Sequence, residues 1–209
     1  LELWLPGDGF GTAAAALLYG DADPAGRLPV TFPADETQGP GATQATYPGT
    51  TTANGAIDTV HFDEDLAVGY RYYDQHRQTP LFAFGDGLSY ARFSIDGAAV
   101  RALPNGGAEV RARVRNKSER GGTEVVQVYV GFPPAAGEPP RQLKGMAKVA
   151  LGAGASREVV IPLGPRAFQV WDPAAGRWVT PAGTFQIAVG RSSREFAATL
   201  DLLPRPGAR

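Results

Sequence analysis

Residues that interrupt helices are spread along the whole chain, and they constrain its fold more than any other feature. The 209 residues include 27 glycines and 18 prolines, about 22% of the chain against roughly 12% in an average globular protein. Glycine destabilises helix interiors through its backbone entropy, and proline through its ring and its missing amide hydrogen. Because 43% of the residues are nonetheless hydrophobic, a core is available. The sequence therefore predicts a folded protein rich in turns and β-strands.

Charge and residue usage exclude several classes of function. Lys and Arg total 20 against 21 Asp and Glu, which leaves a formal net charge of −1, so no basic surface is expected for a nucleic-acid backbone. The chain contains no cysteine, which excludes disulfides, thiolate catalysis and cysteine zinc sites. Two histidines, His61 and His76, are too few for a histidine metal site. No apolar run reaches the roughly 18 residues of a membrane span.

We therefore expect no cofactor, no metal site, no nucleic-acid partner and no membrane partner. The chain also contains no recognisable targeting segment, so the sequence assigns it to neither a secreted nor a cytoplasmic location.

The first part of the chain alternates between strand-like and helix-like segments. Alternate leucines from Leu1 to Leu5 have the spacing of a strand, which predicts that the chain opens within a strand and is a piece of a longer protein. An alanine-rich helix is predicted next, capped by the Thr12 hydroxyl and ended by Gly20 in the left-handed conformation. Residues 33–60 contain prolines, glycines and threonines without an apolar period, which predicts a long loop. Loops of this length are usually functional or lie over another domain.

From about Phe93 onward, apolar residues recur at every second position, the period of a half-buried strand. Turn residues separate the segments with this period, which cover residues 110–114, 126–130, 159–163, 185–189 and 196–200, with shorter candidates at 93–95 and 142–143. The pattern fits an antiparallel β-sandwich of the immunoglobulin or fibronectin type III kind. The two halves of the chain thus differ in fold class, and the boundary is expected near residues 85–95.

Two motifs suggest enzymatic chemistry, but each has a simpler structural explanation. The glycines between Gly7 and Gly11 precede a helix, yet a dinucleotide fingerprint requires its third glycine where Thr12 stands. A tight turn explains them. The string GLSYA at residues 87–91 lacks the final glycine of a nucleophile elbow and precedes a strand pattern instead of a helix. Ser89 is therefore not predicted to be a nucleophile.

Carboxylates and a possible modification site also have structural explanations. Asp21 and Asp23 lie in a turn, where Asp side chains commonly bond to their own backbone. The acidic trio Asp63–Asp65 is explained as a solvated entry to the next segment. Asn116 begins a glycosylation sequon and equally matches a turn between two strands. None of these is predicted to be a metal or acid–base site.

The order of several longer strings resembles glycoside hydrolase family 3. The strings are WLPG at residues 4–7, LYGDADPAGRLPVTFP at 18–33, VGYRYYD at 68–74 and PLFAFGDGLSY at 80–90. They are similar to successive signatures at the end of the α/β/α sandwich domain of that family.

Three strings in the second half resemble the fibronectin type III-like domain that closes many of these enzymes: GTEVVQVYV at residues 122–130, RQLKG at 141–145 and VGRSS at 189–193. The resemblance implies a mixed fold. Residues 1–92, with the long loop at 33–60, are expected to be the C-terminal portion of the α/β/α sandwich domain. Residues 93–209 are expected to form an antiparallel, immunoglobulin-like (fibronectin type III-like) β-sandwich.

The resemblance also implies an activity. Such enzymes are retaining β-glycosidases, most often β-glucosidases, in which an Asp nucleophile forms a glycosyl-enzyme and a Glu acts first as acid and then as base. The family places both residues upstream of the segment that matches here at Trp4–Gly7. No residue of this chain matches either motif, so no catalytic residue is predicted within it. We expect the chain alone to be inactive.

The role that the resemblance leaves for this segment is structural. Arg27, Tyr70 and Arg71 lie among apolar and aromatic residues near the boundary, where a guanidinium can bind carbonyl or carboxylate groups while the aromatic rings pack. We predict that these three residues tie the domains together. The expected partners are the N-terminal barrel and the rest of the α/β/α domain of the same enzyme, which would bind most of the β-glucoside. The alternative is a carbohydrate- or partner-binding module, in which Trp171 and Trp178 stack on sugars instead of filling the core.

Overall fold

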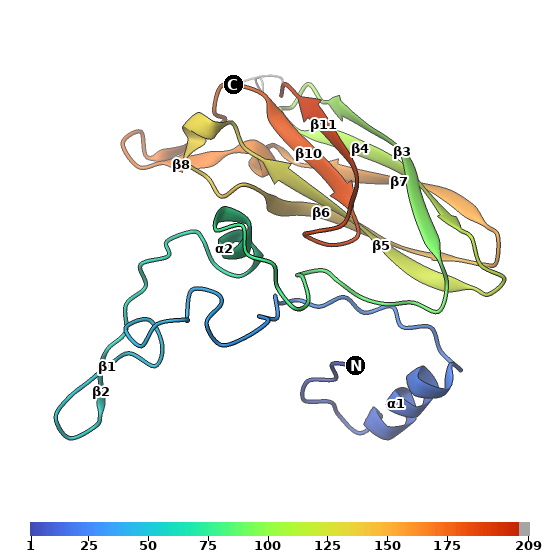
Figure 1. Ribbon diagram of the computed structural model, residues 1–209. Coiled ribbons are helices and arrows are strands. Elements are labelled where there is room, and N and C mark those ends of the chain that lie inside the picture. The colour runs from blue at the N-terminus through green and yellow to red at the C-terminus, as the bar shows by residue number, and fades with distance from the viewer. Residues whose placement is uncertain (205–209) are drawn as a thin grey trace.

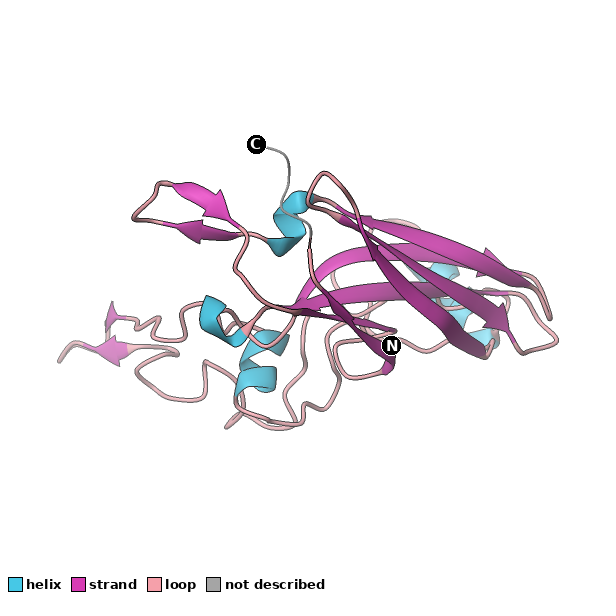
Figure 2. Ribbon diagram, turned by 90° about the horizontal axis from the view of Figure 1, so that it is seen from above, coloured by secondary structure: helices cyan, strands magenta, loops and turns pink. Residues whose placement is uncertain are grey.

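The computed structural model describes residues 1–204 and places a β-sandwich beside an irregular N-terminal part (Figure 1). Viewed from above, the strands gather in the sandwich, whereas the N-terminal part is mostly loop (Figure 2). The last five residues of the predicted sandwich domain, 205–209, lie outside the described residues. The mixed fold expected from the sequence is confirmed.

The sandwich consists of two antiparallel sheets. One has the strand order β11-β10-β5-β6 and the other the order β3-β4-β7. These strands are β3 (Phe93–Ala102), β4 (Ala108–Asn116), β5 (Gly122–Gly131), β6 (Gln142–Leu151), β7 (Ser156–Leu163), β10 (Phe185–Gly190) and β11 (Phe196–Leu202). Each segment that was predicted as a strand from residue 93 onward lies in one of them. The period-two pattern was therefore a reliable guide to this half of the chain.

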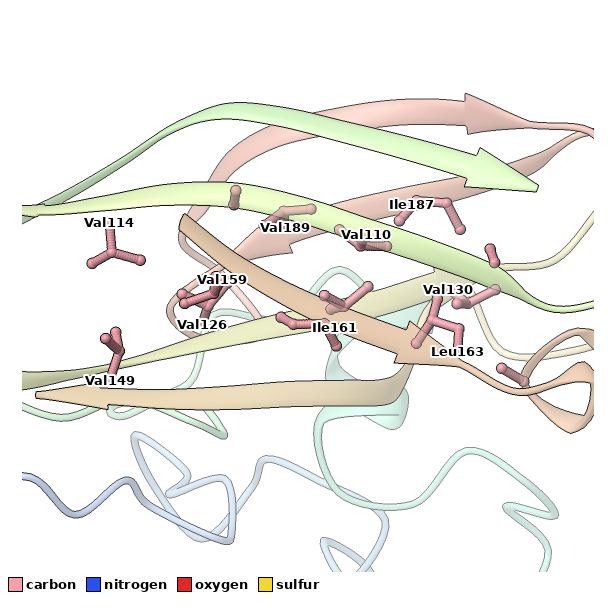
Figure 3. Packing of buried hydrophobic residues seen from close by; sticks show 14 of the residues in the cluster. Val110, Val114, Val126, Val130, Val149, Val159, Ile161, Leu163, Ile187 and Val189 are labelled. Carbon is pink, nitrogen blue, oxygen red and sulfur yellow. The ribbon is translucent and has the colours of Figure 1, made fainter. Parts of the chain in front are cut away.

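The core lies between the two sheets, where side chains from facing strands interdigitate (Figure 3). On β4, Val110, Ala112 and Val114 are at most 1% exposed, while the arginines between them face solvent. In the antiparallel register of β4 and β7, Val110 lies opposite Ile161. Each fully buried aliphatic side chain contributes roughly 1.5–3 kcal/mol relative to an exposed one, so this alternation accounts for much of the stability of the sandwich.

A further ribbon extends from one end of the sandwich (Figure 1). It consists of β8 (Val170–Asp172) and β9 (Arg177–Val179), which pair only with each other. Two short 3₁₀ helices, η1 (Pro134–Ala136) and η2 (Pro165–Phe168), lie in the connections. Strands of three residues are too short to show a period, which explains why the sequence pattern did not indicate them.

The N-terminal part contains one helix close to the predicted position, α1 (Phe10–Tyr19). Gly20 ends it in the left-handed conformation with φ of +83°, as predicted. The predicted cap is wrong, because Thr12 lies inside the helix and Gly9 occupies the cap position without a side-chain hydrogen bond. The predicted strand at Leu1–Leu5 is also wrong: within residues 1–204 this segment pairs with no other strand.

The long loop predicted at residues 33–60 is irregular for most of its length but contains a small hairpin. Its strands are β1 (Thr50–Thr51) and β2 (Ile57–Thr59), and Asn54-Gly55 lies between them. Asn-Gly favours tight hairpin turns because both residues tolerate positive φ.

A second short helix, α2 (Tyr70–Gln75), follows. No helix in the described part of the chain is long and apolar enough to cross a membrane.

Candidate functional site

The central strand of the larger sheet, β5, is buried on both of its faces. Every residue from Glu124 to Gly131 is buried. Val126, Val128 and Val130 face the sandwich core, whereas Val125, Gln127 and Tyr129 lie on the opposite face. The prediction of a half-buried strand is therefore wrong for β5. The N-terminal part covers its outer face, and we call this contact region the junction.

Glu124 is one of two carboxylates buried in the junction, and its side chain is 0% exposed. Arg27 from the N-terminal part forms an ion pair with Oε1. Arg191 binds the other oxygen, with Nη2 at 2.6 Å and Nε at 2.7 Å from Oε2. Burial by itself would lower the pKa of Arg191, but the carboxylates of Glu124 and Glu195 together outweigh that effect and the pKa is raised. A buried carboxylate costs several kcal/mol unless it is paired in this way.

Asp74 is the second buried carboxylate, and its side chain is 1% exposed. It lies on α2 and reaches across to two arginines of the sandwich. Arg141 Nη2 is 3.0 Å from Oδ1, and Arg194 Nη1 is 2.7 Å from the same oxygen. Arg194 also donates to the carbonyl of Gln78 at 2.9 Å. The loop between β10 and β11 thus supplies one arginine to each carboxylate, Arg191 to Glu124 and Arg194 to Asp74.

Aromatic rings fill the space between the two ion-pair clusters. Tyr70 stacks on Phe84, with ring centroids 4.7 Å apart, and meets Tyr129 edge-on at 5.7 Å. The Tyr70 hydroxyl accepts a hydrogen bond from the backbone amide of Leu143 at 2.8 Å. Burial raises the pKa of both Tyr70 and Tyr129. Both phenols therefore stay protonated at neutral pH and act as hydrogen-bonding groups without charge.

Gln127 connects this aromatic cluster to two loops. Its Oε1 accepts from the Tyr129 hydroxyl at 2.6 Å, and its Nε2 donates to the carbonyls of Gly85 and Arg191. The backbone amide of Ser193 donates to the Phe84 carbonyl at 2.9 Å. The junction is thus held by side-chain hydrogen bonds and also by a main-chain hydrogen bond, which does not depend on the rotamer of any side chain.

A third polar contact lies at the start of β5, next to Glu124. Asp23 Oδ1 accepts from the Ser89 hydroxyl at 2.7 Å and from the Tyr90 amide at 2.8 Å, while Oδ2 accepts from the Thr123 amide at 3.0 Å. Asp23 was expected to bond to the backbone of its own turn, but its hydrogen bonds join segments up to 100 residues apart in sequence. Ser89 is committed to this bridge, which agrees with its exclusion as a nucleophile.

Two of the three residues predicted to tie the halves contact the sandwich, each at a different place. Arg27 and Tyr70 both contact the sandwich, as described above. Arg71 does not hydrogen-bond to it in the described part of the chain, and its Nε lies 3.5 Å from the Val68 carbonyl of its own segment. Its predicted role stays a prediction.

Sequence reasoning missed five further charged residues of the junction: Asp74, Glu124, Arg141, Arg191 and Arg194. Two signals point to them. A single Glu within an apolar strand needs a partner if it is buried, and two arginines flank the Ser-Ser turn between β10 and β11.

Two other residues singled out in the sequence also find structural roles. Asn116 is 1% exposed, and its Nδ2 donates to the carbonyls of Arg120, Leu151 and Gly152 at 2.8–3.2 Å. This amide is therefore inaccessible to glycosylation, and the turn interpretation is correct.

Trp171 and Trp178 pair across the β8–β9 ribbon and are 50% and 41% exposed. Their ring planes are inclined at 60°, with centroids 5.6 Å apart. The Arg166 guanidinium lies 3.3 Å from the centroid of the Trp178 ring. The two indoles therefore do not form a flat platform, and Arg166 occupies one face of the second.

The chemistry of the junction is that of a structural contact. Each buried carboxylate is bound by two arginines, and the buried phenols of Tyr70 and Tyr129 form hydrogen bonds within the junction. Within residues 1–204, no group of three or more His, Asp or Glu side chains is placed to hold a metal ion.

Family comparisons agree with this division into two parts. Residues 1–90 match the glycosyl hydrolase family 3 C-terminal domain, and residues 124–193 match the fibronectin type III-like domain. The chain belongs to glycosyl hydrolase family 3. In a family 3 protein, the junction therefore joins the C-terminal domain to the fibronectin type III-like domain.

Two relatives that are named as glycosidases align with nearly all of this family 3 chain. It is 38% identical to probable beta-glucosidase L of Aspergillus terreus over 92% of its length, and 39% identical to an exo-alpha-(1->6)-L-arabinopyranosidase of Bifidobacterium longum over 96%. The chain spans 27% and 26% of these two relatives, about a quarter of their length.

Solved structures show the same arrangement. The family 3 beta-glucosidase of Bifidobacterium adolescentis superposes with a TM-score of 0.86 at 39% identity, covering 96% of this chain and 29% of that one. Beta-glucosidase 3B of Thermotoga neapolitana superposes with a TM-score of 0.83 at 34% identity, covering 95% of this chain and 27% of that one.

Proposed function

We propose that this chain is the non-catalytic C-terminal segment of a retaining β-glycosidase, a family 3 enzyme that hydrolyses β-glucosides, and that it braces the catalytic domains. The observation that carries the proposal is the burial of both faces of β5, whose outer face is covered by the segment that matches the C-terminal domain. Two of the most similar solved structures, described above, are beta-glucosidases. This supports the same class of enzyme here.

In this proposal the domains comprise residues 1–92 and 93–209, and the junction makes them one rigid unit. Arg27 holds Glu124, and Tyr70 packs between Phe84 and Tyr129. Buried ion pairs resist separation because removing one partner leaves an uncompensated charge. The sandwich thereby gives the C-terminal domain a fixed support.

The catalytic groups belong to other parts of the proposed enzyme. Its partners are the N-terminal barrel and the rest of the α/β/α domain of the same polypeptide, which would carry the Asp nucleophile and the Glu acid–base and bind most of the β-glucoside. The two buried carboxylates of the junction are each bound by two arginines, which gives them a structural role instead.

The test is an assay of aryl β-glucoside hydrolysis by two proteins: the isolated 209-residue chain and the longer polypeptide that contains it. We expect no turnover by the isolated chain and measurable turnover by the longer polypeptide. Turnover by the isolated chain would overturn the non-catalytic role. A longer polypeptide that folds but hydrolyses no β-glycoside would overturn the proposed enzyme class.

A carbohydrate-binding module is the second candidate, favoured only by the exposure of Trp171 and Trp178. Two sugar-stacking indoles should present open faces, yet these rings are inclined at 60° and Arg166 covers Trp178. Cross-strand aromatic pairs also stabilise a short ribbon, which gives both tryptophans a structural role. We expect no retention of the chain on insoluble glucan; retention that is lost in Trp171→Ala would favour the module instead.

A further inference from the structure

Exposed apolar side chains are concentrated in the N-terminal part of the chain. Among the 22 large apolar residues that are exposed in the described structure, seventeen lie in residues 1–90 and five lie beyond. Helix α1 has the apolar sequence FGTAAAALLY and no buried residue. A helix of this composition needs a partner surface, and clustered exposed apolar residues mark contact sites. The sandwich therefore covers one side of residues 1–90 and leaves apolar residues exposed elsewhere.

An open depression of about 390 Å³ lies in this part of the chain. Residues 29–31, residues 68–71 and Phe84 line it. Val30 and Val68 among them are 42% and 39% exposed. Phe32, next to this lining, belongs to a row of aromatic rings with Trp4 and Phe82 at centroid distances of 6.4 and 6.2 Å. The depression is thus part of a wider apolar surface.

Two hydrogen-bonding groups of the lining lack good partners within residues 1–204. The Thr31 hydroxyl is buried and makes no hydrogen bond. The Arg71 guanidinium makes one long hydrogen bond, to the Val68 carbonyl at 3.5 Å, and no ion pair with the described acidic residues. No acidic residue lines the depression. Arg71 is half-buried, whereas the Thr31 hydroxyl is a buried polar group of the kind that is almost always paired in proteins. The lining therefore points to a hydrogen-bonding partner from outside the described residues.

We propose that this depression is the docking site of the preceding part of the family 3 polypeptide, which places a carboxylate against Arg71 and a hydrogen-bonding group against Thr31. This inference rests on the proposed function. The occupant is indicated by length, because the chain spans only about a quarter of its relatives. Charge points the same way: a guanidinium in an apolar surround pairs best with a carboxylate, in bidentate geometry. Arg71 is then an interdomain residue whose partner lies outside the sandwich.

The test compares Arg71→Ala in the isolated chain and in the longer polypeptide. In the isolated chain we expect an unchanged melting temperature, because the guanidinium has no distant partner there. In the longer polypeptide we expect the half-life of thermal inactivation to shorten by about tenfold and hydrogen exchange at residues 68–73 to accelerate. Arg71→Lys should restore part of the loss. The matched control is Arg113→Ala, an exposed arginine on β4, which should change neither protein.

Several results would overturn the docking site. One is an equal loss of stability in both proteins, since the partner of Arg71 would then lie within this chain. Another is an unchanged longer polypeptide. Self-association of the isolated chain that Arg71→Ala abolishes would assign the surface to a second copy, and stabilisation of the isolated chain by glucose that requires Arg71 would assign it to a sugar. A longer polypeptide without glycosidase activity overturns the proposed function instead, and hydrogen exchange still reports on the docking site because it needs no activity.

Discussion

Gly85 is a residue whose identity is set by a contact between the two halves of the molecule. Its φ is +83°, a conformation that side chains other than glycine rarely adopt. Its carbonyl accepts from Gln127 Nε2 at 3.0 Å. A Cβ at this position would overlap Gln127 Oε1 and lie 2.8 Å from Nε2. The Gln127 side chain is itself buried, and both its amide oxygen and its amide nitrogen form hydrogen bonds. It therefore has no room to move away.

We therefore expect Gly85→Ala to lower the free energy of unfolding by about 2–3 kcal/mol, through backbone strain and the displaced Gln127 amide. Urea unfolding followed by circular dichroism measures this. Gly152→Ala is the matched control, because a Cβ there meets no atom within 4 Å and Gly152 is not among the glycines with positive φ; it should change the free energy by less than about 0.5 kcal/mol. Equal effects of the two substitutions would contradict the assigned role of Gly85.

At the residue scale, the sequence indicated Arg27 and Tyr70 but not Glu124 or Asp74. An arginine between apolar residues stands out, because its charge demands a partner. A single acidic residue at the start of a strand looks like an ordinary exposed position until the covering segment is known. The role of Asp23 was misjudged for the same reason. Its carboxylate oxygens accept hydrogen bonds from two backbone amides and one hydroxyl that are distant in sequence.

At the scale of elements, strand β5 and the loop between β10 and β11 act together. β5 supplies Glu124, and the loop supplies Arg191, while Arg27 completes the cluster from the N-terminal part. The carboxylate is fully buried, whereas the arginines are 12% and 28% exposed. The carboxylate is therefore the member of the cluster that depends most on its partners.

We expect Glu124→Gln to lower the free energy of unfolding by about 3 kcal/mol, because it keeps the side-chain shape but leaves two guanidinium groups without their buried counter-charge. Chemical denaturation measures the change. The control is Glu109→Gln on β4, where the carboxylate pairs with Arg111 and Arg101 near the surface. Surface pairs contribute about 0–1 kcal/mol, so a loss there as large as at Glu124 would refute the importance of burial.

Elements differ in how well sequence patterns indicated them. The seven sandwich strands were predicted, because their six to ten residues are long enough to show a period of two. The ribbons β1–β2 and β8–β9 have strands of two or three residues and show none. Leu1–Leu5 has the right period but no partner strand in the described structure, and a strand is stable only when its backbone groups are paired.

At the scale of the whole molecule, the N-terminal part acts as a cover for the sandwich. Val125 and Tyr129, on the outer face of β5, are 6% and 0% exposed. Removing the cover would expose these side chains and would leave Glu124 with one arginine. The resulting apolar patch lies on β5, an inner strand of the sheet, where Phe196 packs on one edge of Tyr129.

We expect deletion of residues 1–90 to produce a sandwich that binds a hydrophobic dye several-fold more strongly than the full chain and self-associates as its concentration rises. Dye fluorescence and sedimentation velocity measure the two effects. The full chain at the same concentration is the reference. A deletion variant that stays monomeric, binds no more dye and melts at the same temperature would show that the cover contributes nothing to the sandwich.

The sequence by itself determined the class of each half, the positions of the long strands, the helix end at Gly20 and, through its ordered strings, the family. All of these depend on local patterns: periodicity, turn residues and contiguous motifs. Only the tertiary structure decided that β5 is buried on both faces, that Asp74 and Glu124 are each held by two arginines, and that Arg71 joins neither of these ion-pair clusters. The reason is physical, because burial and ion pairing arise from segments 60 to 120 residues apart in the chain, and no local pattern records which distant segment will cover a strand.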